Sequence, residues 1–194
     1  MKYIAPRFDR ATALRLIYTR RGFLRRLFRP LPARQGLAGE KGVLPYLEIV
    51  YMPYYVATFE FESASAGDVI SVCVDGCGGA FSLFHGETTV TEGAPDGQAF
   101  PPVLSEEEAI LLARKGLLAA LLQQRGQSRR PVPKSIQSVV LLHWPLWVYY
   151  YHRWRGCLDV ILIDAATGER LGGRAKSSVL NAFTSAPATN STTL

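Results

Sequence analysis

Sulfur-bearing and imidazole side chains are scarce in this sequence. Its 194 residues include three cysteines, two methionines and three histidines. An odd number of cysteines cannot form a complete disulfide framework, and Cys73, Cys77 and Cys157 lie in apolar, strand-like surroundings. This pattern predicts reduced thiols, which are typical of a cytoplasmic protein.

Long hydrophobic runs are also missing. The longest covers residues 139–151 and is interrupted by His143 and Pro145, whereas a membrane-spanning helix needs about 20 apolar residues. The first residues include Lys2 and Arg7 and form no apolar segment followed by a small-residue cleavage site, so no signal peptide is expected. We therefore expect no transmembrane segment and a cytoplasmic location.

Positive charge is concentrated in the first part of the chain. The formal net charge is +6, of which residues 1–41 carry +9 and the remaining residues −3. Apolar spacing predicts a helix over residues 9–28, capped by Asp9. Its opposite face carries four arginines: Arg15, Arg25, Arg26 and Arg29. That face is either an ordinary solvated helix surface or, over residues 7–34, a surface for anionic lipid, nucleic acid or an acidic protein.

The other segments alternate between strands and helices. Apolar–polar alternation predicts a hairpin within residues 45–84, followed by a polar linker over residues 85–104. Ser105 and Glu108 form a capping box that opens an amphipathic helix ending at Gly126. Strands over 138–154 and 158–163 and a short helix over 176–183 follow, and the tail over 184–194 buries nothing. The expected fold class is α+β, with antiparallel sheet and helices packed on a face.

Two parts of the chain share residues at matching spacing. If the second hairpin turn is shortened by three residues, the matched residues are Pro53 with Pro145, Asp75 with Asp164, and Gly79 with Gly168. This predicts two related units: residues 1–84, with the basic helix and the first hairpin, and residues 105–183, with the second helix and hairpin. The alternative is that two hairpins look alike because hairpins share such features.

The order helix, long strand, turn, strand, Asp-x-x-x-Gly turn resembles that of PepSY-like and cystatin-like α+β modules. The segments that carry the resemblance are Ser105–Ala109, which opens the helix, and Val160–Gly168, which closes the hairpin. It covers residues 105–172 and, in part, residues 9–84. Modules of this kind mostly bind or regulate, and no catalytic residue is carried over from them. They are commonly extracytoplasmic, unlike the location expected here.

Two aspartates and two cysteines are candidates for chemistry, but structural roles explain them better. Asp75 and Asp164 could be metal ligands or acid–base groups, yet each precedes a glycine in a turn, where Asp commonly binds its own backbone. Cys73 and Cys77 have C-x3-C spacing without the second pair of ligands that a structural zinc site needs. We expect turn-forming carboxylates, buried thiols, no metal and no cofactor.

Histidine supplies one further candidate. His143 and His152 are nine residues apart on one predicted strand, so alternation places them on opposite faces, where they cannot chelate one metal. A nucleophilic site formed by Cys157, His152 and Asp164 is the remaining enzymatic option, and no sequence signature supports it.

The strand over residues 138–154 is aromatic on both faces. Because a helix covers only one face of a sheet, the other face is predicted to meet the other unit, a second copy of the chain or a ligand. The expected contact residues are Trp144, Trp147, Tyr149, Tyr151 and Trp154.

Together these features predict a non-enzymatic binding or assembly module that forms a homodimer or binds a protein partner through the aromatic strand. The alternative is a peripheral protein that binds an anionic surface through residues 7–34. A hydrolase-type enzyme with an unrecognised site ranks third.

Overall fold

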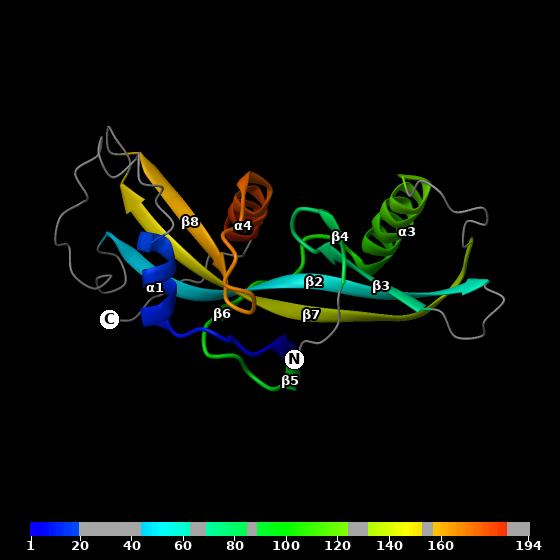
Figure 1. Ribbon diagram of the computed structural model, residues 1–194, viewed down its shortest axis with the longest axis horizontal. Coiled ribbons are helices and arrows are strands. Elements are labelled where there is room, and N and C mark those ends of the chain that lie inside the picture. The colour runs from blue at the N-terminus through cyan, green and yellow to red at the C-terminus, as the bar shows by residue number, and fades with distance from the viewer. Residues whose placement is uncertain (20–43, 63–68, 85–88, 124–131, 153–156, 186–194) are drawn as a thin grey trace.

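The structure is a computed structural model that describes residues 1–19, 44–62, 69–84, 89–123, 132–152 and 157–185. Within these residues the fold is α+β, with three helices and an eight-stranded sheet (Figure 1). The helices are α1 (Arg10–Thr19), α3 (Glu106–Gln123) and α4 (Gly173–Ser185). None of the described helices combines the length and apolarity needed to cross a membrane.

Two long antiparallel strands organise the sheet. β2 (Tyr46–Glu62) and β7 (Val132–His152) pair along their whole overlap, from Tyr46 with Tyr150 to Glu62 with Val132. β3 (Val69–Asp75) pairs with the second half of β2, and β8 (Leu158–Asp164) pairs with the second half of β7. β7 begins six residues before the predicted start, since its first residues pair with the end of β2.

Four short strands complete the sheet and make it mixed. They are β1 (Lys2–Ile4), β4 (Phe81–Leu83), β5 (Val90–Glu92) and β6 (Gln98–Ala99). β4 and β5 pair antiparallel with β3 and β1, whereas β1 is parallel to β7 and β6 is parallel to β2. The two predicted hairpins are antiparallel, as expected, but the sheet as a whole is mixed. Parallel neighbours arise because β1 and β6 each meet a strand that is distant in the sequence.

The paired residues of the two hairpins match one by one. Tyr54 pairs with Asp75, and Leu146, 92 positions after Tyr54, pairs with Asp164, 89 positions after Asp75. The same two offsets relate all seven pairs of the β2–β3 ladder to the seven pairs of the β7–β8 ladder. At the centre of the β2–β7 ladder Met52 pairs with Trp144, again 92 positions later. If each β2 residue is replaced by the β7 residue 92 positions later, and the reverse, the pairs from Tyr46 with Tyr150 to Thr58 with Ser138 map onto one another. This is the pattern that a two-fold axis between the two strands would produce.

The turns after the two hairpins also match. Asp75 Oδ1 accepts hydrogen bonds from the backbone N–H groups of Cys77 (2.9 Å) and Gly78 (3.0 Å), and Asp164 Oδ1 accepts them from Ala166 (2.7 Å) and Thr167 (3.0 Å). The turns close at Gly79 (φ 68°) and Gly168 (φ 76°), where a left-handed backbone favours glycine. The prediction that these aspartates form turns is confirmed.

The segments that precede α1 and α3 make matching contacts, with an offset of 96. Arg7 N–H donates to the Ala165 carbonyl (2.8 Å), as Val103 N–H donates to that of Gly76 (2.9 Å). Two side chains anchor these segments: Trp147 Nε1–H donates to the Phe8 carbonyl (3.0 Å), and the Tyr55 hydroxyl donates to the Leu104 carbonyl (2.9 Å).

Each of these helices lies on the hairpin that belongs to the other half of the sequence. Ala13 and Ile17 of α1 pack in one cluster with Trp147 of β7 and Ile161 of β8. Four residues of α3 (Ala109, Ala113, Leu117 and Leu121) pack on β2 and β3, with Tyr55, Ala57 and Val72. The sequence predicted a helix on each unit's own hairpin; the structure instead exchanges them.

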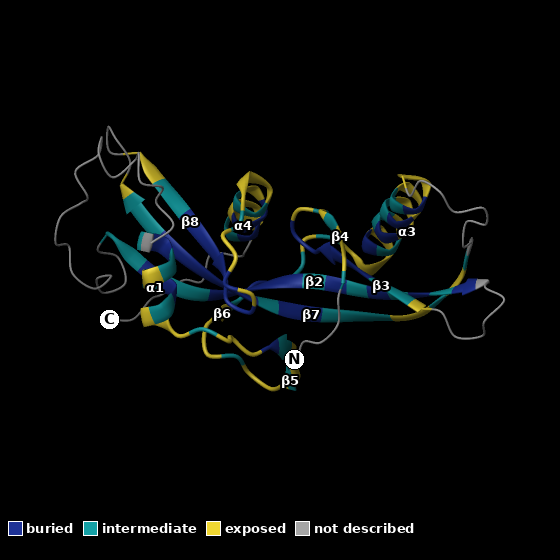
Figure 2. Ribbon diagram, in the orientation of Figure 1, coloured by how far each residue is buried: buried dark blue, intermediate teal, exposed yellow. Residues whose placement is uncertain are grey.

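The predicted linker over residues 85–104 is partly structured. It contains β5 and β6, and Phe100 is buried against α4, with its ring centroid 4.7 Å from that of Phe183. The two halves therefore share one sheet, and Phe100 of the predicted linker contributes to the core. The buried residues concentrate along the middle of β2 and β7 (Figure 2).

The helices occupy both faces of the long strand pair. α1 and α3 contact odd-numbered residues of β2 and β7, such as Tyr55 and Tyr149. α4 contacts the alternate residues, such as Val50, Leu146 and Val148, which point to the opposite face. Both faces of β7 are thus covered within the chain around Leu146–Tyr149.

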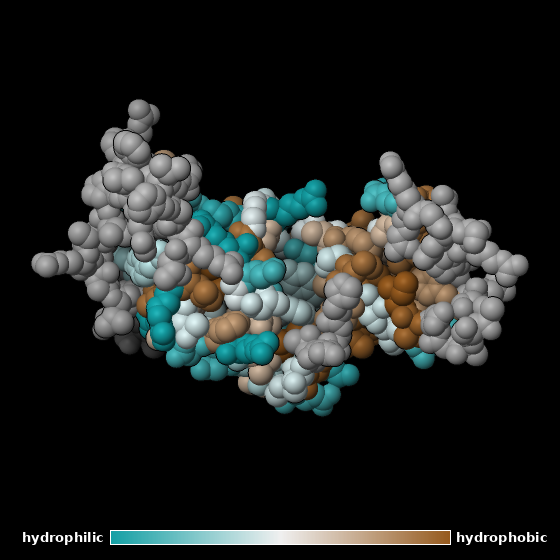
Figure 3. All heavy atoms as spheres, viewed as in Figure 1, coloured by the Kyte–Doolittle hydropathy of each residue, from teal (hydrophilic) through white to brown (hydrophobic). Residues whose placement is uncertain are grey.

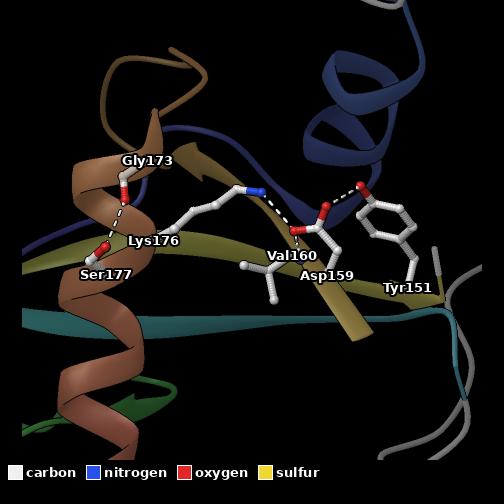
Figure 4. Close-up of polar contacts among 6 residues, drawn as sticks. All are labelled: Tyr151, Asp159, Val160, Gly173, Lys176 and Ser177. Atoms are coloured by element: carbon white, nitrogen blue, oxygen red, sulfur yellow. Dashed lines mark hydrogen bonds and ion pairs between the residues drawn. The ribbon is translucent and has the colours of Figure 1, made fainter. Parts of the chain in front are cut away.

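Helix α4 is tied to β8 by a charged pair (Figure 4). Lys176 Nζ lies 2.8 Å from Asp159 Oδ1, and the Tyr151 hydroxyl donates to Asp159 Oδ2 at 2.9 Å. Partial burial acts to raise the pKa of Asp159, but hydrogen bonds from Lys176, Tyr151 and the Val160 N–H outweigh it and lower the pKa to about 2.

Acid is expected to weaken this attachment. The unfolded pKa of an aspartate is about 4, so the stabilisation by Asp159 is complete above that pH and is lost as the pH falls towards 2. Asp159→Asn should cost about 1–2 kcal/mol at neutral pH and should reduce the loss of stability in the acid window. Urea unfolding between pH 2 and pH 7 measures both effects, with Asp96→Asn, an exposed carboxylate, as control. An unchanged acid sensitivity in Asp159→Asn would contradict the assignment.

Candidate functional site

The aromatic residues of β7 face the interior of the chain. Trp147 and Tyr149 are buried beneath α1, and the Tyr149 ring lies 6.3 Å from that of Tyr18. Trp144 is half-buried, with its ring 6.3 Å from Tyr54 and 6.2 Å from Phe84. A partner protein cannot reach Tyr149 without displacing α1, and Trp147 is only 8% exposed.

The remaining expected contact residues offer little free surface. The half-buried Tyr151 stacks on Tyr149 with a centroid distance of 5.9 Å and donates its hydroxyl to Asp159. Trp154 lies outside the described residues. The prediction placed a partner on the second face because it assigned one helix to each unit; α4 covers that face in the structure.

The predicted anion-binding arginines are mostly outside the described residues. Arg15 is exposed on α1, and Arg25, Arg26 and Arg29 belong to residues 20–43, which the structure does not describe. The anionic-surface hypothesis therefore stays a prediction.

The candidate enzymatic residues do not come together. His152 pairs with Leu158 at one end of the β7–β8 ladder, and Asp164 pairs with Leu146 at the other. Six residues of strand separate the two positions, which corresponds to about 20 Å. The other histidine, His143, is buried, with Nε2 3.2 Å from the Phe100 carbonyl oxygen. The Cys157–His152–Asp164 arrangement is therefore excluded.

The cysteines of the first unit are unreactive by environment. Cys73 and Cys77 are both buried and free, and burial raises the pKa of each thiol to about 11. A thiol with so high a pKa contains little thiolate at neutral pH, and the thiolate is the nucleophilic form. The third cysteine, Cys157, is free and exposed.

The outer face of α3 is the most unusual surface of the described chain. Leu111 is 68% exposed, Leu118 50% and Leu122 60%. Their spacing of seven and four residues places all three on one stripe of the helix. This stripe lies opposite the face that packs on β2 and β3. An amphipathic surface helix normally carries polar residues there.

Comparison with α1 shows that the fold does not need a leucine at position 111. Leu16 of α1 lies beside Gly168, as Leu112 of α3 lies beside Gly79. The preceding residues therefore correspond, and they are Arg15 on α1 and Leu111 on α3. Where α1 presents an arginine to solvent, α3 presents a leucine.

A pocket of about 210 Å³ continues the apolar stripe towards the sheet. Leu118 belongs to the stripe and also lines the pocket. Three apolar residues of β2 and β7 line the pocket with it: Phe59, Pro133 and Ile136. Arg114 and Lys134 also line the pocket, and neither has an ion-pair partner among the described residues. In Figure 3, hydrophobic surface gathers at the end of the molecule that holds α3, next to the atoms drawn in grey.

Charge is graded along α3. Its first turn contains three acids, and the middle of the helix carries two exposed bases, Arg114 and Lys115. The sequence continues beyond Gln123 with further bases: Arg125, Arg129 and Arg130. The acids are Glu106, Glu107 and Glu108. The acids of α3 therefore precede its bases, and further bases follow the helix in the sequence.

Sequence reasoning identified the buried stripe of this helix and its capping box, which the structure confirms: Glu108 N–H donates to Ser105 Oγ (3.2 Å), and Ser105 N–H donates to Glu108 Oε2 (2.9 Å). It missed the second stripe: Leu111, Leu118 and Leu122 share one face by spacing, but their exposure follows only from how α3 packs. The chain matches no family model, and no curated protein or solved structure matches it.

Proposed function

We propose that this protein is a non-enzymatic assembly module of the cytoplasm that self-associates through the outer face of α3. The observation that carries the proposal is the exposed leucine stripe at 111, 118 and 122, since the corresponding position on α1 is an arginine. Three free cysteines support the cytoplasmic location.

A second copy of the chain fits this surface better than an unrelated acidic protein. In an antiparallel arrangement, the two leucine stripes face each other, and each α3 presents both acids, in its first turn, and bases, at Arg114 and Lys115. Burial of six half-exposed leucines contributes on the order of 5–10 kcal/mol before the cost of association, which is of similar size. We therefore expect a weak dimer in the micromolar range.

Replacing the stripe with glutamine should abolish the dimer. Glutamine is a good helix former and all three positions are exposed, so Leu111→Gln/Leu118→Gln/Leu122→Gln should keep its melting temperature and become monomeric. Light scattering coupled to size exclusion, over a range of concentrations, measures the mass. Leu180→Gln is the matched control, because Leu180 is 58% exposed on α4; that variant should remain dimeric. A wild type that is monomeric throughout would overturn the proposal.

We also propose that the chain consists of two copies of one unit. Matching ladders, turns and N-terminal contacts support this, with offsets of 92, 89 and 96 positions. Each unit contains a short parallel strand, a helix, a long strand and a shorter strand, and this order also supports the proposed resemblance to PepSY-like and cystatin-like modules. In this view each N-terminal segment and helix is exchanged onto the other unit, as in a swapped dimer joined into one chain.

The alternative function, an anionic surface formed by residues 7–34, remains a second proposal carried by the +9 charge of residues 1–41. Retention on heparin that falls steeply with salt and is lost when Arg15, Arg25, Arg26 and Arg29 are replaced with glutamine would support it.

A further inference from the structure

A cleft of about 510 Å³ opens where the N-terminal segment crosses the sheet. It lies at the start of α1, and none of its lining residues belongs to α3. Four aromatic residues line it (Tyr3, Phe8, Tyr51 and Trp147), together with two arginines and two aspartates (Arg7, Arg10, Asp9 and Asp96). Its volume falls within the range of small-molecule sites, about 300–1,000 Å³.

Several polar groups of the cleft have no partner within the described residues. The hydroxyl groups of Tyr3 and Tyr51 form no hydrogen bond there, and the Arg7 guanidinium and the Asp96 carboxylate form no ion pair. Tyr51 is only 1% exposed, and its ring meets that of Tyr3 edge to face at 5.7 Å. Burial, Tyr3 and Asp96 raise the pKa of Tyr51, so its hydroxyl stays protonated and can donate.

The corresponding place in the other half of the chain lacks these groups. At the same offsets, Tyr3 corresponds to Ala99, Arg7 to Val103 and Tyr51 to His143. The fold thus forms with a small or an apolar residue where the cleft has Tyr3 and Arg7, whereas the counterpart of Tyr51 is a buried histidine. The ring of Tyr3 and the charge of Arg7 are therefore not required for packing.

We propose that this cleft binds an aromatic zwitterion, a small molecule with one aromatic ring system, one carboxylate and one ammonium group, as in a free aromatic amino acid. Arg7 binds the carboxylate, because a guanidinium matches its planar geometry. Asp96 binds the ammonium group. The rings of Tyr3, Phe8 and Trp147 receive the aromatic part.

Three probes separate these contacts in isothermal titration calorimetry. L-Tryptophan has both charges, tryptamine lacks the carboxylate and indole-3-propionate lacks the ammonium group. Wild-type protein should bind L-tryptophan about tenfold more tightly than either analogue, as expected for one charge-assisted contact. Arg7→Gln should lower the affinity for L-tryptophan and for indole-3-propionate about tenfold and leave the affinity for tryptamine unchanged. Asp96→Asn should lower the affinity for L-tryptophan and for tryptamine to a similar extent and leave the affinity for indole-3-propionate unchanged.

Arg174→Gln, at an exposed arginine on α4, is the control and should bind all three probes like the wild type. The triple glutamine variant of α3 should also retain binding, so failure of the self-association proposal leaves this one intact. The proposal is overturned if wild-type protein binds none of the probes at millimolar concentration. It is equally overturned if Arg7→Gln and Asp96→Asn leave L-tryptophan binding unchanged or weaken all three probes alike.

Discussion

Trp147→Ala is expected to lower the free energy of unfolding by about 3–5 kcal/mol, the usual cost of truncating a buried aromatic residue. Trp147 packs with Ala13 and Ile17 of α1, and its Nε1–H donates to the Phe8 carbonyl at 3.0 Å. The substitution therefore removes both the apolar contact and the hydrogen bond that hold α1 on the β7–β8 hairpin. Urea unfolding monitored by circular dichroism measures the loss.

Trp147→Phe separates the two contributions. It keeps most of the apolar area but loses the hydrogen bond to Phe8 and leaves a small cavity, so it should cost about 1–2 kcal/mol. Tyr55→Phe is the matched change on the other half, since it removes only the bond from Tyr55 to the Leu104 carbonyl, and a cost of about 1 kcal/mol is expected. A loss below about 1 kcal/mol for Trp147→Ala would show that α1 is not held in this way.

Asp164→Ala and Asp75→Ala should each cost about 2–4 kcal/mol, because each leaves two backbone N–H groups without their acceptor. Both carboxylates are buried in turns of the same geometry, so the two losses should agree within about 1 kcal/mol. The corresponding Asp→Asn changes keep an acceptor oxygen and should cost less. Chemical denaturation of the four variants measures these losses of unfolding free energy. A large loss for one aspartate with none for the other would contradict the equivalence of the turns.

Local features of the fold were predictable from the sequence because their causes are local. The caps at Asp9 and Ser105 satisfy nearby N–H groups, as Asp9 Oδ1 does for Thr12 at 2.8 Å. The Asp-x-x-x-Gly turns and the alternating hairpin strands were identified for the same reason.

The exchange of α1 and α3 between the hairpins could not be predicted. Periodicity shows that Ala13 and Ile17 face a core, but both hairpins offer similar apolar faces, and the sequence does not say which one is met. The same limit explains β1 and β6. Strands of three and two residues are too short to show alternation, and their partners lie far away in the sequence.

The candidate surface illustrates a different difficulty. The aromatic strand was predicted to be the contact surface because both of its faces carry large side chains, yet α1 and α4 cover those faces. Leu111, Leu118 and Leu122 look like core residues in the sequence, and only the position of α3 on β2 and β3 shows that they point outward. An apolar residue is informative when it is exposed, and exposure depends on packing.

Crosslinking at the centre of the stripe tests the self-association claim most directly. In a Cys157→Ser background, where the other two cysteines are buried, Leu118→Cys should give a covalent dimer with a short bis-maleimide reagent at micromolar protein. Leu180→Cys, at the equally exposed position on α4, should remain monomeric. Equal crosslinking at the two positions, or none at either, would contradict assembly through the outer face of α3.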